Sequence, residues 1–323
     1  MNRIVSLLPS STEIVAALGL GHRLVGRSHE CNYPLWVEEL PVLTAPKFDT
    51  NCSSEEIDNS VIDLLKEGLS VYDIDEELLQ QLNPDFILTQ SLCDICAVSL
   101  QDVENAVCKL TSSDSQLISL QPNEVKDIFD DILRVGKVLG VESRAEELVN
   151  EIAQRFDTIR KKVAKVKNKP TVAMVEWISP LMLGGNWIPE LVELAGGESL
   201  FAKSGEHSHY HEWESVVEAD PDIIVVMPCG FDVERAMEEM CLLAEKEGWN
   251  NLKAVKNEKV FVADGNHFFN RPGPSIAESA EILSEIFYPE LFPANHKGTG
   301  YVNYSFLYAK FRRENSSFQN VTV

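Results

Sequence analysis

The amino-acid sequence predicts an α/β protein in which two similar lobes are joined by a single long helix. Strands and helices alternate in both halves of the chain, and a Pro-Asp pair followed by an apolar strand occurs once in each half, at 83–87 and at 220–224. The stretch 142–167 between them contains no proline or glycine and is typical of a helix. With 323 residues, of which 44% are hydrophobic, the chain can bury a core in each lobe.

In the first lobe, expected over residues 1–140, apolar runs predict strands, and apolar residues at helical spacing predict helices. Ser11 or Thr12 can cap the first helix, and Asn83-Pro84 ends a later one. The expected elements, in order, are a strand at 3–8, a helix at 13–18, a strand from 24, a helix at 75–82, strands at 85–89 and 116–120, and a helix at 125–139.

A bridging helix is expected over residues 141–167, and its Lys-rich end favours a solvated strut. The second lobe, expected over 168–293, repeats the pattern of the first. Its expected elements are strands at 171–177, 222–227 and 260–263, a helix from 187 that stops at Gly196, and helices at 213–219 and 275–287. From 294 to 323 the chain becomes polar and rich in Ser and Asn, which indicates a tail outside the lobes.

Charge and cysteine usage limit the classes of partner and compartment. The net charge of −23 opposes binding to nucleic acid and to anionic membrane surfaces. The first apolar run is interrupted at 9–13, where a signal peptide would continue, and the apolar stretch 14–20 is too short to span a bilayer. Seven cysteines spread over a long chain are typical of reduced thiols. We therefore expect a cytoplasmic protein with no nucleic-acid partner and no membrane insertion.

The segments that follow the expected strands are the candidate site. Open α/β sheets bind ligands beyond the carboxyl ends of their strands. Here these segments are rich in polar, aromatic and thiol side chains, and they would converge on one cleft if the two lobes face one another. The candidate ligand-binding residues are His29, Cys31, Tyr33, Gln90, Cys93, Cys96, Trp177, Asn186, Trp187, Cys229, Phe231, His267, Phe269 and Arg271.

Five segments resemble the cobalamin- and siderophore-type substrate-binding proteins of ABC importers. The resemblance extends from residue 3 to about residue 292 and is specific as a set. Three segments match the family at large, and two match its cobalamin-binding subgroup. They are 3–13 (RIVSLLPSSTE), 189–197 (PELVELAGG) and 269–274 (FNRPGP) for the family, and 92–99 (LCDICAVS) and 227–232 (MPCGFD) for the subgroup.

The resemblance implies a class III periplasmic-binding-protein fold, in which one long helix bridges two Rossmann-like lobes. It also implies a corrinoid or a related tetrapyrrole or metal-chelate ligand. No signal peptide or lipid-attachment cysteine is evident near the start, in contrast to exported members of the family. In those members one glutamate on each lobe docks to arginines of a permease, and Glu13 and Glu193 are at the matching positions. The other interpretation of both is an ordinary exposed helix carboxylate.

Several candidate residues have more than one interpretation. The rings of Trp177, Trp187, Phe231 and Phe269 would form apolar walls for a macrocycle, or they pack in the core. His267 could coordinate a cobalt ion axially, form a hydrogen bond to a corrin side chain, or lie at the rim of the cleft without a role in binding. Arg271 could bond carbonyl or carboxylate groups of the ligand.

The cysteines separate by their places in the sequence. Cys52, Cys108 and Cys241 are expected to be inert thiols. A set of four in strand-end segments could bind zinc or an iron–sulfur cluster, contact a corrinoid, or simply pack; it consists of Cys31, Cys93, Cys96 and Cys229.

The leading hypothesis is a non-enzymatic binding protein for a small molecule of the corrinoid or tetrapyrrole class, bound between the lobes. One alternative is a cytosolic metal-cofactor protein that uses the four strand-end cysteines. A second is a thiol-redox enzyme that works through Cys93 and Cys96.

Overall fold

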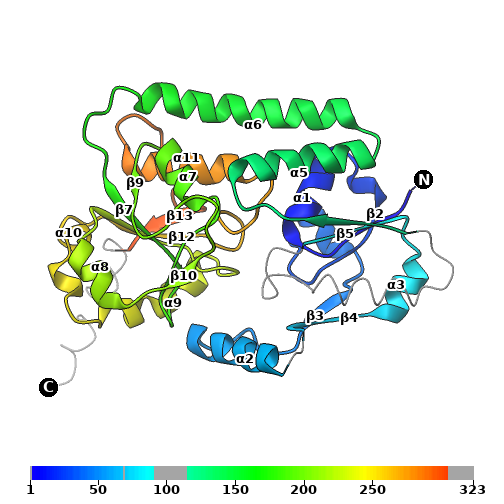
Figure 1. Cartoon of the computed structure of the whole chain (residues 1–323), viewed down its shortest axis with the longest axis horizontal. Coiled ribbons are helices and arrows are strands. Elements are labelled where there is room, and N and C mark those ends of the chain that lie inside the picture. Colours follow the sequence, from blue (N-terminus) through cyan, green and yellow to red (C-terminus); the bar gives the residue numbers. More distant parts are fainter. Residues whose placement is uncertain (1, 68–69, 91–114, 305–323) are drawn as a thin grey trace, which may run out of the picture. The chain divides into compact units, whose positions relative to one another are not determined.

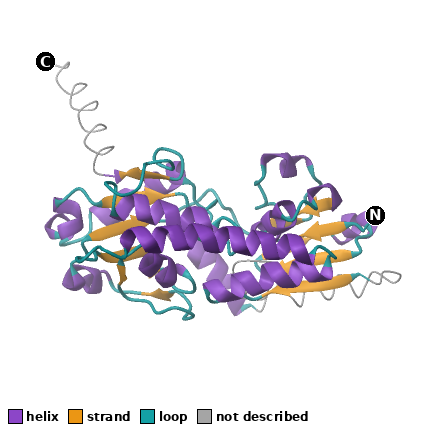
Figure 2. Cartoon of the chain, turned by 90° about the horizontal axis from the view of Figure 1, so that it is seen from above, coloured by secondary structure: helices purple, strands orange, loops and turns teal. Residues whose placement is uncertain are grey.

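The computed structural model describes residues 2–67, 70–90 and 115–304 of the chain. The chain forms two compact units. Unit 1 contains residues 1–155 and 271–277, and unit 2 contains residues 156–270 and 278–323. The first boundary between the units falls inside helix α6 (Glu142–Val163), which is a single continuous helix (Figure 1). Both units combine strands with helices (Figure 2), so the predicted α/β class is confirmed.

The central sheet of unit 1 is parallel, with the strand order β2-β1-β5-β6. The sheet consists of β1 (Ile4–Ser6), β2 (Leu24–Arg27), β5 (Phe86–Gln90) and β6 (Gln116–Leu120). Every residue of β1 and β5 is buried, because inner strands of a parallel sheet are covered on both faces. A separate antiparallel pair, β3 (Thr44–Pro46) and β4 (Tyr72–Ile74), belongs to the same unit (Figure 1).

The helices in the described part of unit 1 are α1 (Pro9–Ala17), α2 (Ser54–Lys66), α3 (Glu76–Leu82) and α5 (Val125–Val138), with short 3-10 turns at Gly21–Arg23 and Leu35–Glu39. The predicted helices at 75–82 and 125–139 and strands at 85–89 and 116–120 are confirmed to within one residue at each end. Helix α2 and the pair β3-β4 were not predicted.

Helix α1 begins four residues before its predicted start. Leu8 is its N-cap and Pro9 is its first residue, a position that suits proline because the first N–H of a helix needs no partner. The prediction that Ser11 or Thr12 caps the helix is therefore wrong. Both lie inside it, and the Ser11 hydroxyl donates to the carbonyl oxygen of Leu8.

The sheet of unit 2 is mixed, with the order β10-β8-β7-β11-β12-β13 and β9 paired with β7. Parallel pairing joins β7, β11 and β12, and β8, β10 and β13 run antiparallel to their neighbours. The strands are β7 (Thr171–Trp177), β8 (Met182–Leu183), β9 (Glu198–Ser199), β10 (His209–Tyr210), β11 (Ile223–Val226), β12 (Val260–Ala263) and β13 (Tyr301–Asn303). Predicted strands 171–177 and 260–263 are confirmed without a shift.

The helices of unit 2 are α7 (Ile188–Leu194), α8 (Trp213–Ala219), α9 (Val233–Ala244), α10 (Lys253–Lys256) and most of α11 (Ile276–Phe287), with a 3-10 turn at Trp249–Asn251. Helix α9 was not predicted. Helix α6 ends at Val163, four residues before the predicted end at 167, and Ala164 closes its last turn by bonding to the carbonyl of Arg160. Among the described helices, none is both long and apolar enough to cross a bilayer.

Two segments depart from the expected division of the chain. Strand β13 comes from the region predicted as a tail, yet it pairs with β12 over Phe261–Ala263. Its Tyr301 is buried, and the ring of this residue packs against that of Phe261 in β12. The segment 271–277 clusters with unit 1 although its neighbours in sequence belong to unit 2. It contains Arg271, whose partners lie in unit 1.

Candidate functional site

The segment after β2 places His29 beside Thr44 of β3. Thr44 Oγ1 lies 2.7 Å from Nδ1 of the His29 ring and accepts a second bond, 3.0 Å long, from the His29 backbone N–H. The Thr44 hydroxyl itself donates to Ser28 Oγ over 3.1 Å. Burial and the charge of Arg27 lower the pKa of His29 to about 4, so the ring is neutral at pH 7.

Glu30 is the next residue, and its carboxylate accepts a hydrogen bond from the Tyr72 hydroxyl of β4 at 3.1 Å. Burial raises the pKa of Glu30, while the Tyr72 bond and the charge of Arg271 oppose this rise. The Tyr72 ring also packs against the His29 ring, with 5.1 Å between ring centres. Strands β3 and β4 thus orient the side chains of His29 and Glu30, which follow β2.

Arg271 is buried in unit 1 and forms an ion pair with Glu13 of α1. Its Nη1 donates to Glu13 Oε1 at 3.0 Å, and its Nη2 donates to Asn32 Oδ1 at 2.7 Å. The side chains of Arg271 and Glu13 are 4% and 3% exposed. Glu13 is therefore no exposed carboxylate, and its predicted docking to a permease is wrong, because its charge is already used inside the unit.

Cys31 is fully buried, and its sulfur lies 3.1 Å from the Thr12 hydroxyl. Burial raises the pKa of Cys31 to about 11, which favours the neutral thiol. In the absence of a metal Cys31 is thus a neutral thiol, and its role as a metal ligand stays a prediction.

The other candidates from the first half differ in exposure. Tyr33 is 43% exposed, and Gln90 is the buried last residue of β5. Cys93 and Cys96 lie outside the described residues, so their predicted place at the cleft stays a prediction. In the part of the chain that the structure describes, no group of three or more His, Cys, Asp or Glu side chains could bind a metal ion.

In unit 2, two candidate aromatics pack against each other. Trp177 ends β7, and its ring centre lies 5.2 Å from that of Phe231. The guanidinium of Arg235 stacks 4.4 Å from the centre of the Phe231 ring. Both aromatic side chains are buried, which favours packing over an open apolar wall.

Trp187 and Phe269 form a second buried pair. The indole Nε1 of Trp187 donates to the carbonyl oxygen of Phe269 at 2.7 Å. The Phe269 backbone N–H donates to Ser279 Oγ at 3.0 Å. Phe269 has φ = +58°, a left-handed conformation that is costly for an aromatic residue, and the two hydrogen bonds maintain it.

The segment before α7 contains the candidate Asn186. Its backbone N–H and carbonyl bond to Glu206 and Gly205, and φ is +49°. Its side-chain Oδ1 is buried and has no hydrogen-bond partner among the described residues. The oxygen is closed off from solvent, so its capacity to accept a hydrogen bond is unmet in this structure.

Close backbone contacts position the neighbouring segments. A Cβ on Gly185 would lie 2.4 Å from the carbonyl oxygen of Glu206, and one on Gly265 would lie 2.1 Å from that of Pro228. Only glycine permits these approaches.

Cys229 is half-buried and its N–H bonds to the Glu176 carbonyl. The His267 ring stacks on Phe268 with 4.5 Å between ring centres.

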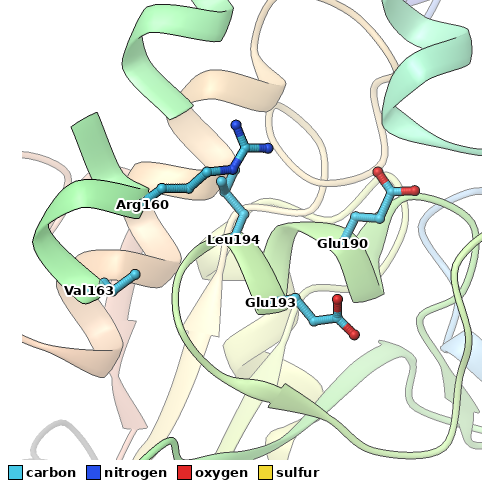
Figure 3. Close-up of a pocket in the computed structure, with 5 residues that line it drawn as sticks. All are labelled: Arg160, Val163, Glu190, Glu193 and Leu194. Atoms are coloured by element: carbon cyan, nitrogen blue, oxygen red, sulfur yellow. The ribbon is translucent and has the colours of Figure 1, made fainter. Parts of the chain in front are cut away.

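Glu193 is exposed on α7 and lines a surface pocket of about 340 Å³ in unit 2. Figure 3 shows Glu190 and Glu193 on α7, and Arg160 extending from α6 toward Leu194; Val163 completes the lining. Glu193 thus keeps the exposure that the docking prediction requires.

Thr44, Ser28 and Tyr72 were not among the predicted site residues. Thr44 and Tyr72 lie on three-residue strands, too short for an alternating pattern to be visible. Ser28 directly follows β2, and its place beside His29 was the one available signal.

Comparison with known proteins identifies relatives over nearly the whole chain. The sequence model of the family described as periplasmic binding protein matches residues 4–266. An ABC transporter substrate-binding lipoprotein of Bacillus subtilis is 24% identical over 297 residues, which cover 90% of this chain and 81% of the relative. A vitamin B12-binding protein of Vibrio cholerae is 23% identical over 292 residues, 86% of each chain.

Among solved structures, a periplasmic heme-binding protein of Pseudomonas aeruginosa has the same fold. It superimposes with a TM-score of 0.70 at 19% identity, covering 91% of this chain and 95% of that one. This agreement extends the fold assignment over both units.

The predicted cytoplasmic location is wrong. The matching family comprises periplasmic binding proteins, and the relative from Bacillus subtilis is a lipoprotein. The prediction relied on the polar interruption at 9–13, but these residues belong to helix α1 of the folded unit. Their composition therefore reflects the fold and gives no information about targeting. The cytosolic metal-cofactor alternative has no support among these relatives either.

Proposed function

The chain belongs to the periplasmic binding protein family, and from this premise we propose that it binds a tetrapyrrole of the corrinoid type as a non-enzymatic substrate-binding protein. The observation that carries the proposal is the similarity to the vitamin B12-binding protein, which spans 86% of both chains. A haem is the second candidate, since a protein of the same fold binds heme.

The described residues fit such a ligand. Corrinoids and haems combine a broad apolar ring with peripheral amides or carboxylates and a central metal. Unit 2 offers Asn186 Oδ1, a buried acceptor without a partner in the described part of the chain, which suits an amide N–H of a corrin side chain once the surrounding side chains move aside to admit it. Unit 1 offers the neutral imidazole of His29. That residues from both units contact one ligand stays part of the proposal.

Titration calorimetry of the full chain with cyanocobalamin, dicyanocobinamide and haem tests the ligand class. We expect a dissociation constant in the micromolar range or tighter for at least one of them, on the order of −8 kcal/mol. Asn186→Ala should weaken the binding of the corrinoids, and Asn257→Ala, at the exposed end of α10, serves as the matched control. The absence of measurable heat with all three compounds would refute the proposal.

We also propose that Glu193 docks to the permease of an ABC importer, as the family resemblance implies. Its exposure on α7 supports this role. In reconstituted transport, Glu193→Ala should reduce ligand delivery without changing ligand affinity, whereas the exposed Glu198→Ala should change neither. Normal delivery with Glu193→Ala would remove this residue from the interface.

A further inference from the structure

Two histidines, His29 and His267, lie in strand-end loops, and their rings have different environments. The His267 ring stacks flat against Phe268. The His29 ring is instead oriented by hydrogen bonds to its Nδ1 edge. The hydrogen bond at Nδ1 fixes the orientation of the His29 ring, which is what a metal-coordinating histidine needs.

Thr44 fixes the tautomer of His29. A hydroxyl has one proton, and that of Thr44 is donated to Ser28 Oγ. Thr44 Oγ1 can therefore only accept at its other two contacts, the backbone N–H of His29 and the ring Nδ1. The ring proton must then be on Nδ1, and Nε2 has a free lone pair in the neutral ring.

The Nε2 atom remains available to a ligand. Among the described residues, the His29 ring has a hydrogen bond only at Nδ1, and the residue is half-buried and not enclosed. Metal-coordinating histidines commonly donate their other ring N–H to a fixed acceptor, which sets ring orientation and increases the basicity of the coordinating nitrogen. Thr44 meets this requirement in unit 1.

We propose that His29 Nε2 is an axial ligand to the metal of the bound tetrapyrrole, with Thr44 as its positioning residue. The inference rests on the proposed function and narrows the ligand class to metal tetrapyrroles with an axial position that a protein nitrogen can take. Haem and cobinamide have such a position. Histidine is a regular axial ligand of haem iron.

The test compares ferric haem with metal-free protoporphyrin, because the two rings share their shape and carboxylates and differ in the metal. His29→Gln removes the imidazole and keeps a neutral polar side chain of similar length. We expect it to weaken haem binding tenfold or more and to change protoporphyrin binding less than twofold. Its haem absorption spectrum should lose the signature of a nitrogen ligand, and added imidazole should restore it.

The matched controls are His267→Gln and two Thr44 variants. His267→Gln should leave the haem spectrum unchanged. Thr44→Val should shift the spectrum and weaken haem binding several-fold, because the ring loses its acceptor, and Thr44→Ser should restore both. Circular dichroism verifies that each variant is folded.

The outcomes separate the two proposals. If His29→Gln weakens haem and protoporphyrin equally, or changes neither the affinity nor the spectrum, the coordination proposal is overturned while tetrapyrrole binding stands. If the wild-type protein binds only cobalamin among haem, cobinamide and cobalamin, coordination by His29 is also overturned. Failure of every tetrapyrrole to bind would refute the proposed function, and the coordination proposal with it.

Discussion

The strand-end loops of unit 1 and unit 2 are built from different chemistry. In unit 1 they lie beside a buried ion pair, Arg271 with Glu13 of α1, and contain hydrogen bonds that join His29 to Thr44. In unit 2 the corresponding loops contain packed rings, Trp187 among them. The contrast shows that similar α/β units can stabilise these irregular segments either by satisfying buried charge or by burying aromatic area.

The two solutions have different energetic consequences. A buried ion pair is sensitive to the loss of one partner, because the remaining charge stays in a low-dielectric interior. An aromatic cluster loses contacts in proportion to the atoms that are removed. Substitutions in unit 1 should therefore be the more damaging, and the following measurements test this comparison.

The largest effect is expected for Arg271→Met in unit 1. It leaves Glu13 buried without its cationic partner, at a cost of about 3–5 kcal/mol. Urea unfolding measures this loss. Combining Arg271→Met with Glu13→Leu should recover much of it, since neither member of the ion pair then remains. A double variant as unstable as the single one would show that packing, and not charge, dominates here.

At pH 8, iodoacetamide should alkylate Cys31 at least about a hundredfold more slowly than a free cysteine thiol, and the less buried Cys229 should react faster than Cys31. A pKa raised from 9.0 to about 11 reduces the thiolate of Cys31 about a hundredfold, and burial slows it further. Labelling of Cys31 should rise about tenfold per pH unit, because its thiolate fraction does. Mass spectrometry of digests taken at successive times measures the alkylated fraction of each cysteine. Equal rates at pH 8 would contradict the buried placement of Cys31.

A smaller effect is expected for Trp187→Phe in unit 2. The change retains most of the apolar area but leaves the Phe269 carbonyl without its donor, which costs about 1–3 kcal/mol. Urea unfolding again provides the measurement, and Trp249→Phe is a buried control for loss of indole area. A cost above that of Arg271→Met would reverse the order of the two units.

The smallest effects are expected at helix caps, one in each unit. Ser53 caps α2 in a capping box with Glu56, and Asp232 caps α9. Replacing either by Ala should cost about 1 kcal/mol. Similar shifts in thermal midpoint for Ser53→Ala and Asp232→Ala would show that the units differ at their loops and not in their helices.

Elements with a strong local pattern could be predicted from the sequence. Strand β7 contains a continuous apolar run at 172–175 and pairs in parallel with β11, and its predicted bounds were right. Helix α2 was missed although Ser53 and Glu56 already formed a capping-box signature. The strand β13 was missed because its three residues give no period.

The candidate site was harder to predict because its contacts join distant residues. Arg271 and Glu13 are separated by 258 positions, so no local pattern could indicate that they pair. The aromatic candidates were recognised, but their burial depends on neighbours such as Arg235 that lie in an element that was not predicted. His29 was selected from its place after a strand, whereas its partner Thr44 depends on a strand pair that only the structure revealed.

Strand β13 limits where the chain can be cut. It covers the outer edge of β12, and removing everything after residue 293 would leave the backbone N–H and C=O groups of that strand unpaired. Uncovered edges recruit strands from other molecules, so such a fragment should aggregate during expression. A shortened chain for crystallisation should retain residues through Tyr304, whose ring packs on Trp249. Fusion partners at the C-terminus then need a spacer, so that they do not pull this strand from the sheet.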